Sequence, residues 1–179
     1  MDFIDKIPII GVMGSGSQAY HEKSVPLGRW IAQSGYHLLS GGGGGVMEAV
    51  SKSFCQTKDR KGYSIGIIPG KTDDDAYQPL SGYPNPWIEI PIQTHLPLSG
   101  VKGTSALSRN HINILSAHVI IALPGSHGTK SEIILALKYK KPVLGFFQSA
   151  AGEFGDDLEI ECIDSFKDLT IRINKILGT

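Results

Sequence analysis

Short apolar runs alternate along this chain with segments whose apolar residues recur at helical spacing, and this alternation constrains the fold more than any other feature. The runs expected to form strands are residues 8–13, 37–40, 64–69, 87–92, 118–123, 142–147 and 158–162. The segments expected to form helices are about residues 22–34, 45–57, 105–117, 128–139 and 165–177. Strict alternation of this kind favours a doubly wound, modified Rossmann α/β fold, with a mainly parallel sheet of about seven strands and helices on both faces.

The composition is that of one globular domain without a strong charge bias. The 179 residues suit a single domain, 1–179, because no linker or shift in composition divides them. Lys plus Arg and Asp plus Glu both number 17, so the net charge is zero and a nucleic-acid partner is disfavoured. No apolar run approaches the ~18 residues that span a bilayer, so no membrane role is predicted.

The N-terminal sequence and the cysteines predict a cytoplasmic protein. The opening "MDFIDKIPIIGVMG" lacks a basic region followed by a long apolar stretch, so we expect no secretory signal. Cys55 and Cys162 are too few and too far apart for a disulfide framework or a C-x-x-C metal site. The histidines show no metal-ligand spacing either, and no structural metal is predicted.

Two segments are expected to be long loops. Residues 70–87 hold three consecutive aspartates and three prolines, and residues 93–105 hold two glycines after the fourth predicted strand. Loops of this length in a compact domain are lids, binding loops or tolerated surface insertions. The sequence leaves these alternatives open.

The first glycine turn follows the first predicted strand and contains Gly14, Ser15 and Gly16. It resembles the start of a dinucleotide fingerprint, but no third glycine stands at the expected place. The second strand ends at Ser40 and glycine rather than at an acidic residue. An NAD site is therefore not predicted, and the alternatives are a ligand-binding turn and a tight structural turn.

The second turn, "SGGGGGVMEA", places Gly42, Gly43, Gly44 and Gly45 directly before a predicted helix. Backbone amides and the helix dipole at such a position favour an anion. Met47 and Glu48 fall in the first helical turn. Glu48 is either part of the site or an ordinary partner of the helix dipole.

The third turn, "LPGSHGTKSE", again leads from a strand into a helix. Its candidate ligand-binding residues are Pro124, Gly125, Ser126, His127, Gly128 and Thr129. Carboxyl ends of parallel strands meet at one edge of a sheet, so we expect the three turns to lie together. None of them has the G-K-[ST] of a P-loop, which disfavours hydrolysis of a nucleoside triphosphate.

The segment "SALSRNHINILSAH" is expected to be a helix with Ser105 as its N-cap. Its predicted buried stripe consists of Leu107, His111, Ile114 and Leu115. Arg109 falls on another face and is the best candidate for a phosphate or carboxylate, because its planar guanidinium allows bidentate contact. Further along the chain, Thr129 and Glu132 fit a capping box, in which the carboxylate would bond the helix start and not a ligand.

The paired motifs "GGGGGVMEA" and "LPGSHGTKSE" resemble G-G-G-x-G-[VI]-M-E-A and P-G-G-x-G-T-x-x-E. These mark the LOG-like family, the Lonely guy cytokinin-activating phosphoribohydrolases. Within that superfamily the chain resembles the molybdenum cofactor carrier proteins, through "PIIGVMGSG", "IGIIPG", "SRNHINILSAHVIIAL" and "ALKYKKPV". The resemblance covers about residues 7–147.

The resemblance implies a non-catalytic protein that stores, protects or transfers the molybdenum cofactor, a molybdopterin-type anionic ligand. The alternative is a LOG-type phosphoribohydrolase that cleaves a cytokinin-like nucleoside 5′-monophosphate into base and ribose 5-phosphate, with Arg109 and Glu132 as the catalytic pair. Carrier proteins keep both residues, so they do not decide between the two. Ser126 stands where the motif has glycine, and Asn110 where the family usually has lysine. The resemblance also implies a homo-oligomer, either dimer or tetramer, and a molybdoenzyme or molybdenum-insertion partner.

Overall fold

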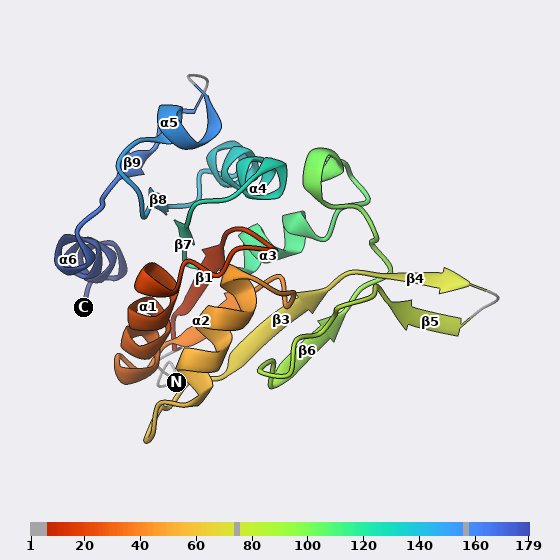
Figure 1. Cartoon of the computed structure of the whole chain (residues 1–179), viewed down its shortest axis with the longest axis horizontal. Coiled ribbons are helices and arrows are strands. Elements are labelled where there is room, and N and C mark those ends of the chain that lie inside the picture. The colour runs from red at the N-terminus through yellow and green to blue at the C-terminus, as the bar shows by residue number, and fades with distance from the viewer. Residues whose placement is uncertain (1–6, 74–75, 156–157) are drawn as a thin grey trace, which may run out of the picture.

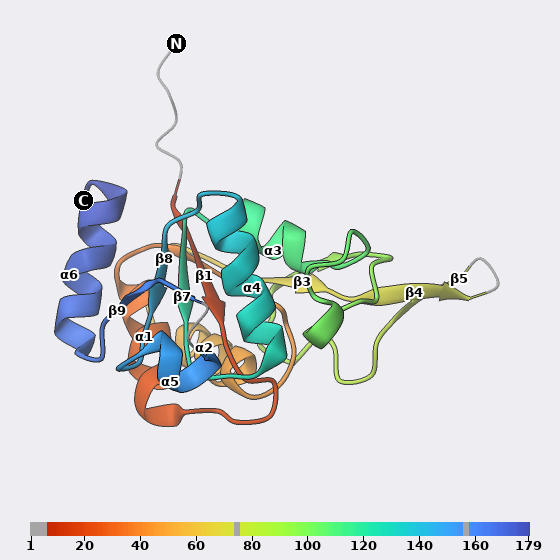
Figure 2. The same ribbon diagram turned by 90° about the horizontal axis from the view of Figure 1, so that it is seen from above.

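A computed structural model describes residues 7–73, 76–155 and 158–179 (Figures 1 and 2). Its main sheet has seven strands in the order β6-β3-β2-β1-β7-β8-β9, and every neighbouring pair is parallel. The strands are β1 Ile9–Met13, β2 His37–Ser40, β3 Ser64–Ile68, β6 Ile90–Gln93, β7 Val119–Ala122, β8 Val143–Gly145 and β9 Glu161–Cys162. The predicted doubly wound α/β fold is confirmed, although β8 and β9 are shorter than their apolar runs.

Helices cover both faces of the sheet because the central strands are buried on both sides. On one face, α1 His21–Gln33, α2 Val46–Cys55 and α6 Phe166–Leu177 enclose a core that includes Ile10, Val12 and Ile121. On the other, α3 Asn110–Ser116 and α4 His127–Lys138 pack against Ile120 and their neighbours, and α5 Ala150–Phe154 closes a smaller cluster (Figure 1). Consecutive apolar residues in the central strands therefore supply two different cores.

The strand order reverses between β1 and β7, and this fixes where a ligand can bind. The chain builds β1, β2, β3 and β6 in one direction, then returns to place β7 on the free side of β1. The turns that follow β1 and β7 therefore diverge over a crevice at the carboxyl edge of the sheet. In open α/β sheets ligands bind at this switch point.

The expectation of a continuous loop over residues 70–87 is wrong. β4 Gly70–Asp73 and β5 Ala76–Pro79 form an antiparallel hairpin that projects from the body (Figures 1 and 2). Two of the three aspartates, at positions 74 and 75, lie outside the described residues, as do residues 1–6. The fourth parallel strand, β6, begins at Ile90 instead of residue 87, and all four of its residues are exposed at the sheet edge.

The predicted helix over residues 105–117 is also corrected. Only α3 is helical, and Ser105 lies in the turns before it. Leu107 and Leu115, expected in the buried stripe, are 58% and 50% exposed, whereas Asn110 and Asn113 are buried. Ile114 is fully buried as predicted, but it shares the inward side of the helix with the two asparagines, so the apolar residues mark the buried face only in part.

The second segment expected as a loop, residues 93–105, contains one 3-10 turn, η1 Gly100–Lys102, which packs against α4. Within the described part of the chain, no helix has the length and apolar character needed to cross a membrane.

Candidate functional site

The three predicted glycine turns meet at Ser15. The Ser15 backbone N–H donates to the carbonyl of Pro124 at 3.1 Å, and the Ser15 carbonyl accepts from the N–H of Val46 at 2.9 Å. One residue of the first turn is thus bonded to the third turn and to the first residue of α2. The structure brings the turns after β1, β2 and β7 to one place at the switch point, as their positions in the sequence predict.

Two positions of the second turn have no room for a side chain, Gly45 because of the backbone and Gly41 because of Arg109. Gly45, the N-cap of α2, has φ of 60°, and a Cβ there would collide with the carbonyl of Ser15. A Cβ on Gly41 would collide with the guanidinium of Arg109. These positions let the turn pass between the first turn and the arginine, which no side chain would permit.

Both helices that begin at this edge lack a side-chain cap. α2 starts after Gly45 and α4 starts after Ser126, and neither N-cap residue accepts a hydrogen bond through its side chain. The first N–H groups of a helix have no partner within the helix, and the dipole adds positive potential there. Two such ends beside each other suit an anion with more than one charged group.

Arg109 is the most unusual residue of the site, because it is a buried charge with unused donors. It is 3% exposed, and its Nε and Nη1 atoms have no hydrogen-bond partner. The guanidinium carbon lies 5.5 Å from the centre of the Tyr83 ring. An unpaired buried charge costs several kcal/mol, so these donors indicate a place for an anion.

Glu132 lies in the same buried region and does not cap α4. The N-cap is Ser126, not Thr129, so the predicted capping box is wrong. The Glu132 carboxyl instead accepts a hydrogen bond from Asn113 Nδ2 at 3.3 Å. Burial raises its pKa to about 7, against the opposing effects of the Arg109 charge and the Asn113 hydrogen bond. A carboxyl with this pKa can hold or release a proton near neutral pH.

Other predicted residues divide between the wall of the site and its rim. The Thr129 Oγ1 is buried without a partner, whereas Gly16, Ser126 and His127 are exposed. Gly14 lies against the side chain of Val46.

Several predicted contacts instead hold the turns in shape. Met47 Sδ accepts from the N–H of Gly43, and Ser15 Oγ accepts from the N–H of Gln18. Asn110 donates to Ser131 Oγ at 3.3 Å. Glu48 is partly buried in the first turn of α2.

Sequence reasoning assigned no role to Tyr83 and Asn85, which lie between the hairpin and β6. Asn85 donates through its backbone N–H to the Gly42 carbonyl at 2.7 Å and through Nδ2 to the Gly43 carbonyl at 2.8 Å. The ring of Tyr83 lies against Gly43. The only signal in the sequence is an asparagine and an aromatic residue within a proline-rich segment, which is equally typical of an ordinary turn.

The loop over residues 93–105 lies beside the start of α4. A Cβ on Gly128 would be 3.8 Å from Gly100, and Gly103 packs on the side chains of Ser131 and Asn110. A cavity of about 290 Å³ opens on the other side of the helix start, lined by Ser126, His127, Lys130, Glu153 and Phe154. The rim of the site at the start of α4 therefore includes part of this loop.

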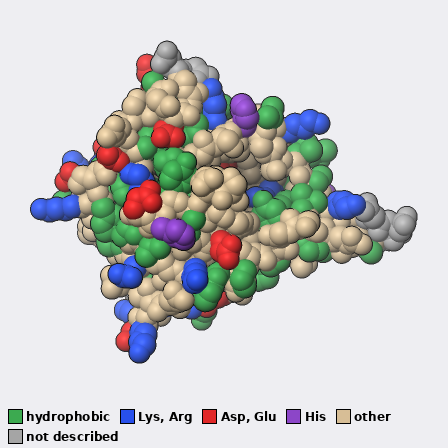
Figure 3. Space-filling model, viewed as in Figure 1, with side chains coloured by type: hydrophobic (Ala, Val, Ile, Leu, Met, Phe, Trp, Pro, Cys, Tyr) green, Lys and Arg blue, Asp and Glu red, His purple; other side chains and the backbone are tan. Residues whose placement is uncertain are grey.

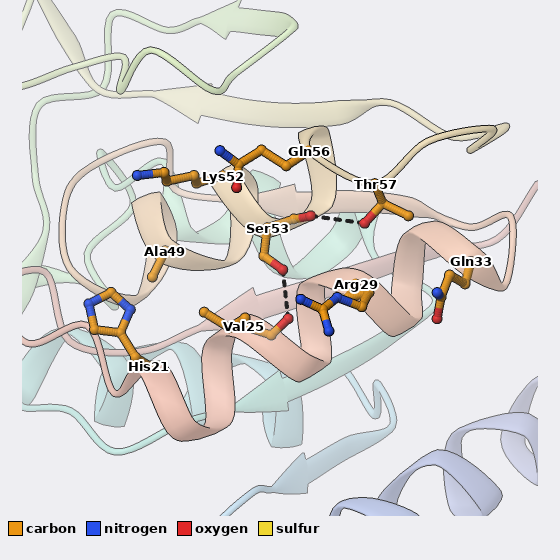
Figure 4. A pocket seen from close by; sticks show the side chains of 9 residues that line it. All are labelled: His21, Val25, Arg29, Gln33, Ala49, Lys52, Ser53, Gln56 and Thr57. Atoms are coloured by element: carbon orange, nitrogen blue, oxygen red, sulfur yellow. Dashed lines mark hydrogen bonds between the residues drawn. The ribbon is translucent and has the colours of Figure 1, made fainter.

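A separate cavity of about 340 Å³ lies between α1 and α2, and the glycine turns do not line it (Figure 4). In that groove Ser53 Oγ donates to the Val25 carbonyl at 2.6 Å, a bond that joins the two helices (Figure 4). Figure 3 shows acidic and basic side chains interspersed over the face seen in Figure 1, with a hollow near its centre. Among the described residues, no group of three His, Cys, Asp or Glu side chains could hold a metal ion.

The fold is that of a Rossmann-like α/β protein, and its candidate ligand site lies among glycine-rich turns at the switch point. The chain belongs to the SLOG cluster4 family, whose family model matches residues 7–169. An uncharacterized protein of Archaeoglobus fulgidus is 33% identical over 140 residues, which are 77% of this chain and 79% of that protein.

Two solved structures are similar over nearly the whole chain. The molybdenum cofactor binding protein of the phototrophic bacterium Rippkaea orientalis is 32% identical with a TM-score of 0.73, covering 97% of this chain and 99% of that one. The molybdenum cofactor carrier protein of Chlamydomonas reinhardtii is 30% identical with a TM-score of 0.74, covering 97% and 100%. The predicted resemblance to this group of proteins is confirmed.

We expect the free energy of unfolding to fall, relative to that of a Glu132→Gln variant, as the pH rises from about 4.5 to about 7. The unfolded chain loses this proton near pH 4.5, whereas the folded protein keeps it to about 7. The stability that the bound proton contributes is therefore lost across this window, by up to about 3 kcal/mol. Urea unfolding of both proteins at pH 5 and pH 8 measures this loss. If their difference in the free energy of unfolding is the same at both pH values, the raised pKa of Glu132 is contradicted.

Proposed function

We propose that this protein binds the molybdenum cofactor as cargo and stores, protects or transfers it. The observation that carries the proposal is the buried Arg109 with unpaired donors, which lies against Gly41 in the turn that leads to the uncapped start of α2. The cofactor bears a phosphate and molybdenum oxo groups, which are anionic acceptors. Arg109, Thr129 and the amides of residues 44–45 and 125–129 would hold them, with residues 14–16 as a third wall. Gly42 and Gly43, whose N–H groups bond Ser40 Oγ and Met47 Sδ, would shape the turn. The similar cofactor-binding proteins support this ligand over other anions.

Replacing Gly128 by valine tests the carrier function. The new side chain would enter open space at the start of α4, where only Gly100 comes within 4 Å, so the fold is unaffected while the anion is excluded. We expect binding of the cofactor to weaken at least tenfold, which corresponds to about 1.4 kcal/mol. Fluorescence titration and protection of the cofactor from oxidation are the measurements.

Gly152→Val is the matched control, because that glycine is also helical with open space around it and lies in α5. A wild-type protein that neither binds the cofactor nor slows its oxidation would contradict the proposal. If both variants lose binding equally, the effect is not specific to the start of α4, and the ligand binds elsewhere.

A second function is favoured by the position of Glu132, which lies near Arg109 in place of capping its helix. A carboxyl with a pKa of about 7 beside a buried arginine can activate water or steady a positive sugar centre. The corresponding activity is hydrolysis of a nucleoside 5′-monophosphate to free base and ribose 5-phosphate. Arg109 would orient the phosphate or ribose, and Glu132 would act on the glycosidic carbon.

Incubation with AMP and with an N6-prenylated AMP decides whether the second function operates. If it does, free base is released and Glu132→Gln lowers the rate at least 100-fold, the size expected for loss of an acid–base group. Glu153→Gln is the control, because Glu153 lines the neighbouring cavity but is not part of the Arg109 pocket. Absence of base release, or equal release by both variants, would exclude the hydrolase and leave the carrier.

The same protein is proposed to be a homo-oligomer, and to deliver its cargo to a molybdoenzyme or molybdenum-insertion partner. α3 and α4 contact each other, and four apolar residues on or beside them are at least 37% exposed: Leu107, Leu115, Ile134 and Leu137. A helix that is apolar on its outer side as well as its inner side favours burial by a second copy.

A negative charge introduced on this apolar surface of α3 and α4 is expected to dissociate the oligomer. Light scattering coupled to size exclusion should show a dimer or tetramer for the wild type and a monomer for Ile134→Glu combined with Leu115→Glu. Ile171→Glu on α6 introduces the same charge at a residue that is 57% exposed and should leave the oligomer intact. A monomeric wild type at micromolar concentration would contradict the proposed assembly.

A further inference from the structure

The guanidinium of Arg109 lies against a glycine and near an aromatic ring. Its Nη1 and Nη2 atoms lie so close to Gly41 that no Cβ would fit there. Its carbon is 5.5 Å from the centre of the Tyr83 ring. A cation over an aromatic face is attracted by the ring quadrupole, and the attraction is larger where water is excluded. Arg109 is almost completely buried, so this condition is met.

The segment that carries Tyr83 is fastened to the glycine turn. Asn85 donates two hydrogen bonds to it, from its backbone N–H to Gly42 and from Nδ2 to Gly43. Its side-chain oxygen accepts from the N–H of Trp87 at 3.0 Å, so the asparagine is fixed in one orientation. Asn85 is 5% exposed. The ring position therefore depends on the turn that also contacts the guanidinium.

Both ends of this segment are tied to the main sheet or its extension. The N–H of Leu80 donates to the Pro69 carbonyl at 3.0 Å, next to the hairpin, and the N–H of Glu89 donates to the Ser64 carbonyl at 2.9 Å in β3. The segment from residue 80 to residue 89 thus closes over the turn after β2. The contacts that it makes with the glycine turn include the Tyr83 ring and the Asn85 amide.

We infer that Tyr83 and Asn85 form a positioning clamp for Arg109, one that fixes the plane of its guanidinium before a ligand arrives. The clamp leaves Nε and Nη1 unpaired and available as donors to a phosphate-type anion. A mobile arginine side chain loses rotamer freedom when it binds an anion, and a guanidinium that is already fixed in orientation loses less. The inference rests on the proposed function for the identity of the ligand, but the orientation of Arg109 is a property of the ligand-free protein.

The orientation can be measured directly by NMR. The Nε–Hε signal of Arg109, identified by its loss in Arg109→Gln, should be sharp and slow to exchange in the wild type. Tyr83→Phe keeps the ring face and should keep the signal. Tyr83→Leu keeps apolar bulk without the quadrupole, and it should broaden the signal or speed its exchange at least tenfold. Tyr63→Leu is the matched control, since Tyr63 is 51% exposed and stacks on His37.

Affinity provides the second readout, with AMP as a phosphate-monoester probe in calorimetry. Tyr83→Phe should bind within twofold of the wild type, and Tyr83→Leu about tenfold more weakly. In an Arg109→Gln background, Tyr83→Leu should change the affinity less than twofold, because the ring acts through the arginine. If Tyr83→Leu weakens AMP binding about tenfold in the Arg109→Gln variant as well, the ring touches the ligand itself. That result would overturn the positioning role.

Asn85→Asp tests the other half of the clamp. Aspartate keeps an acceptor for the N–H of Trp87 but replaces the donor to the Gly43 carbonyl by an oxygen, so the turn and the Tyr83 ring should separate. The Arg109 signal should broaden as in Tyr83→Leu. An unchanged Arg109 signal in both variants would overturn the clamp. A wild type that binds neither the cofactor nor AMP, but shows these NMR effects, would refute the proposed function and leave the clamp standing.

Discussion

The unpaired charge of Arg109 is the feature on which the rest of the site depends. A buried guanidinium with two unused donors is unfavourable in the absence of an anion, so the surrounding structure has to hold it in place. The glycine at position 41 makes room for it, and the ring of Tyr83 lies 5.5 Å from the guanidinium carbon. The favourable packing of two complete hydrophobic cores offsets this local cost.

Much of the fold could be predicted because the relevant signals are local. Consecutive apolar residues in the runs at 8–13 and 118–123 indicate strands buried on both faces, and the glycine turns after them indicate where the chain leaves the sheet. The hairpin over residues 70–79 gave no such signal, since its strands are largely exposed and have no apolar alternation. The start of β6 was misplaced for the same reason, because an exposed edge strand is not selected for burial.

The site was predicted only where backbone chemistry carries it. Runs of glycine identify the turns, but the roles of Asn113 and Asn85 follow from long-range contacts that no spacing in the sequence reveals. Helix α3 shows why periodicity fails here. Its inward side carries Asn110 and Asn113 beside Ile114, because it borders a polar pocket. The apolar Leu115 remains outside, and Leu107 is exposed before the helix begins. A helix beside a ligand site can thus invert the pattern by which helices are oriented from sequence.

Glu132 shows how one side chain can serve either proposed function. The capping box expected at Thr129 would have removed the carboxyl from the pocket, whereas the actual helix start at Ser126 places it a turn and a half further into α4. There it faces Asn113 and the charge of Arg109, with a pKa of about 7. Near neutral pH such a group can stay protonated beside an anionic cargo and so avoid repelling it. The same proton could be transferred to a leaving base, so the difference between carrier and hydrolase depends on which ligand reaches the carboxyl.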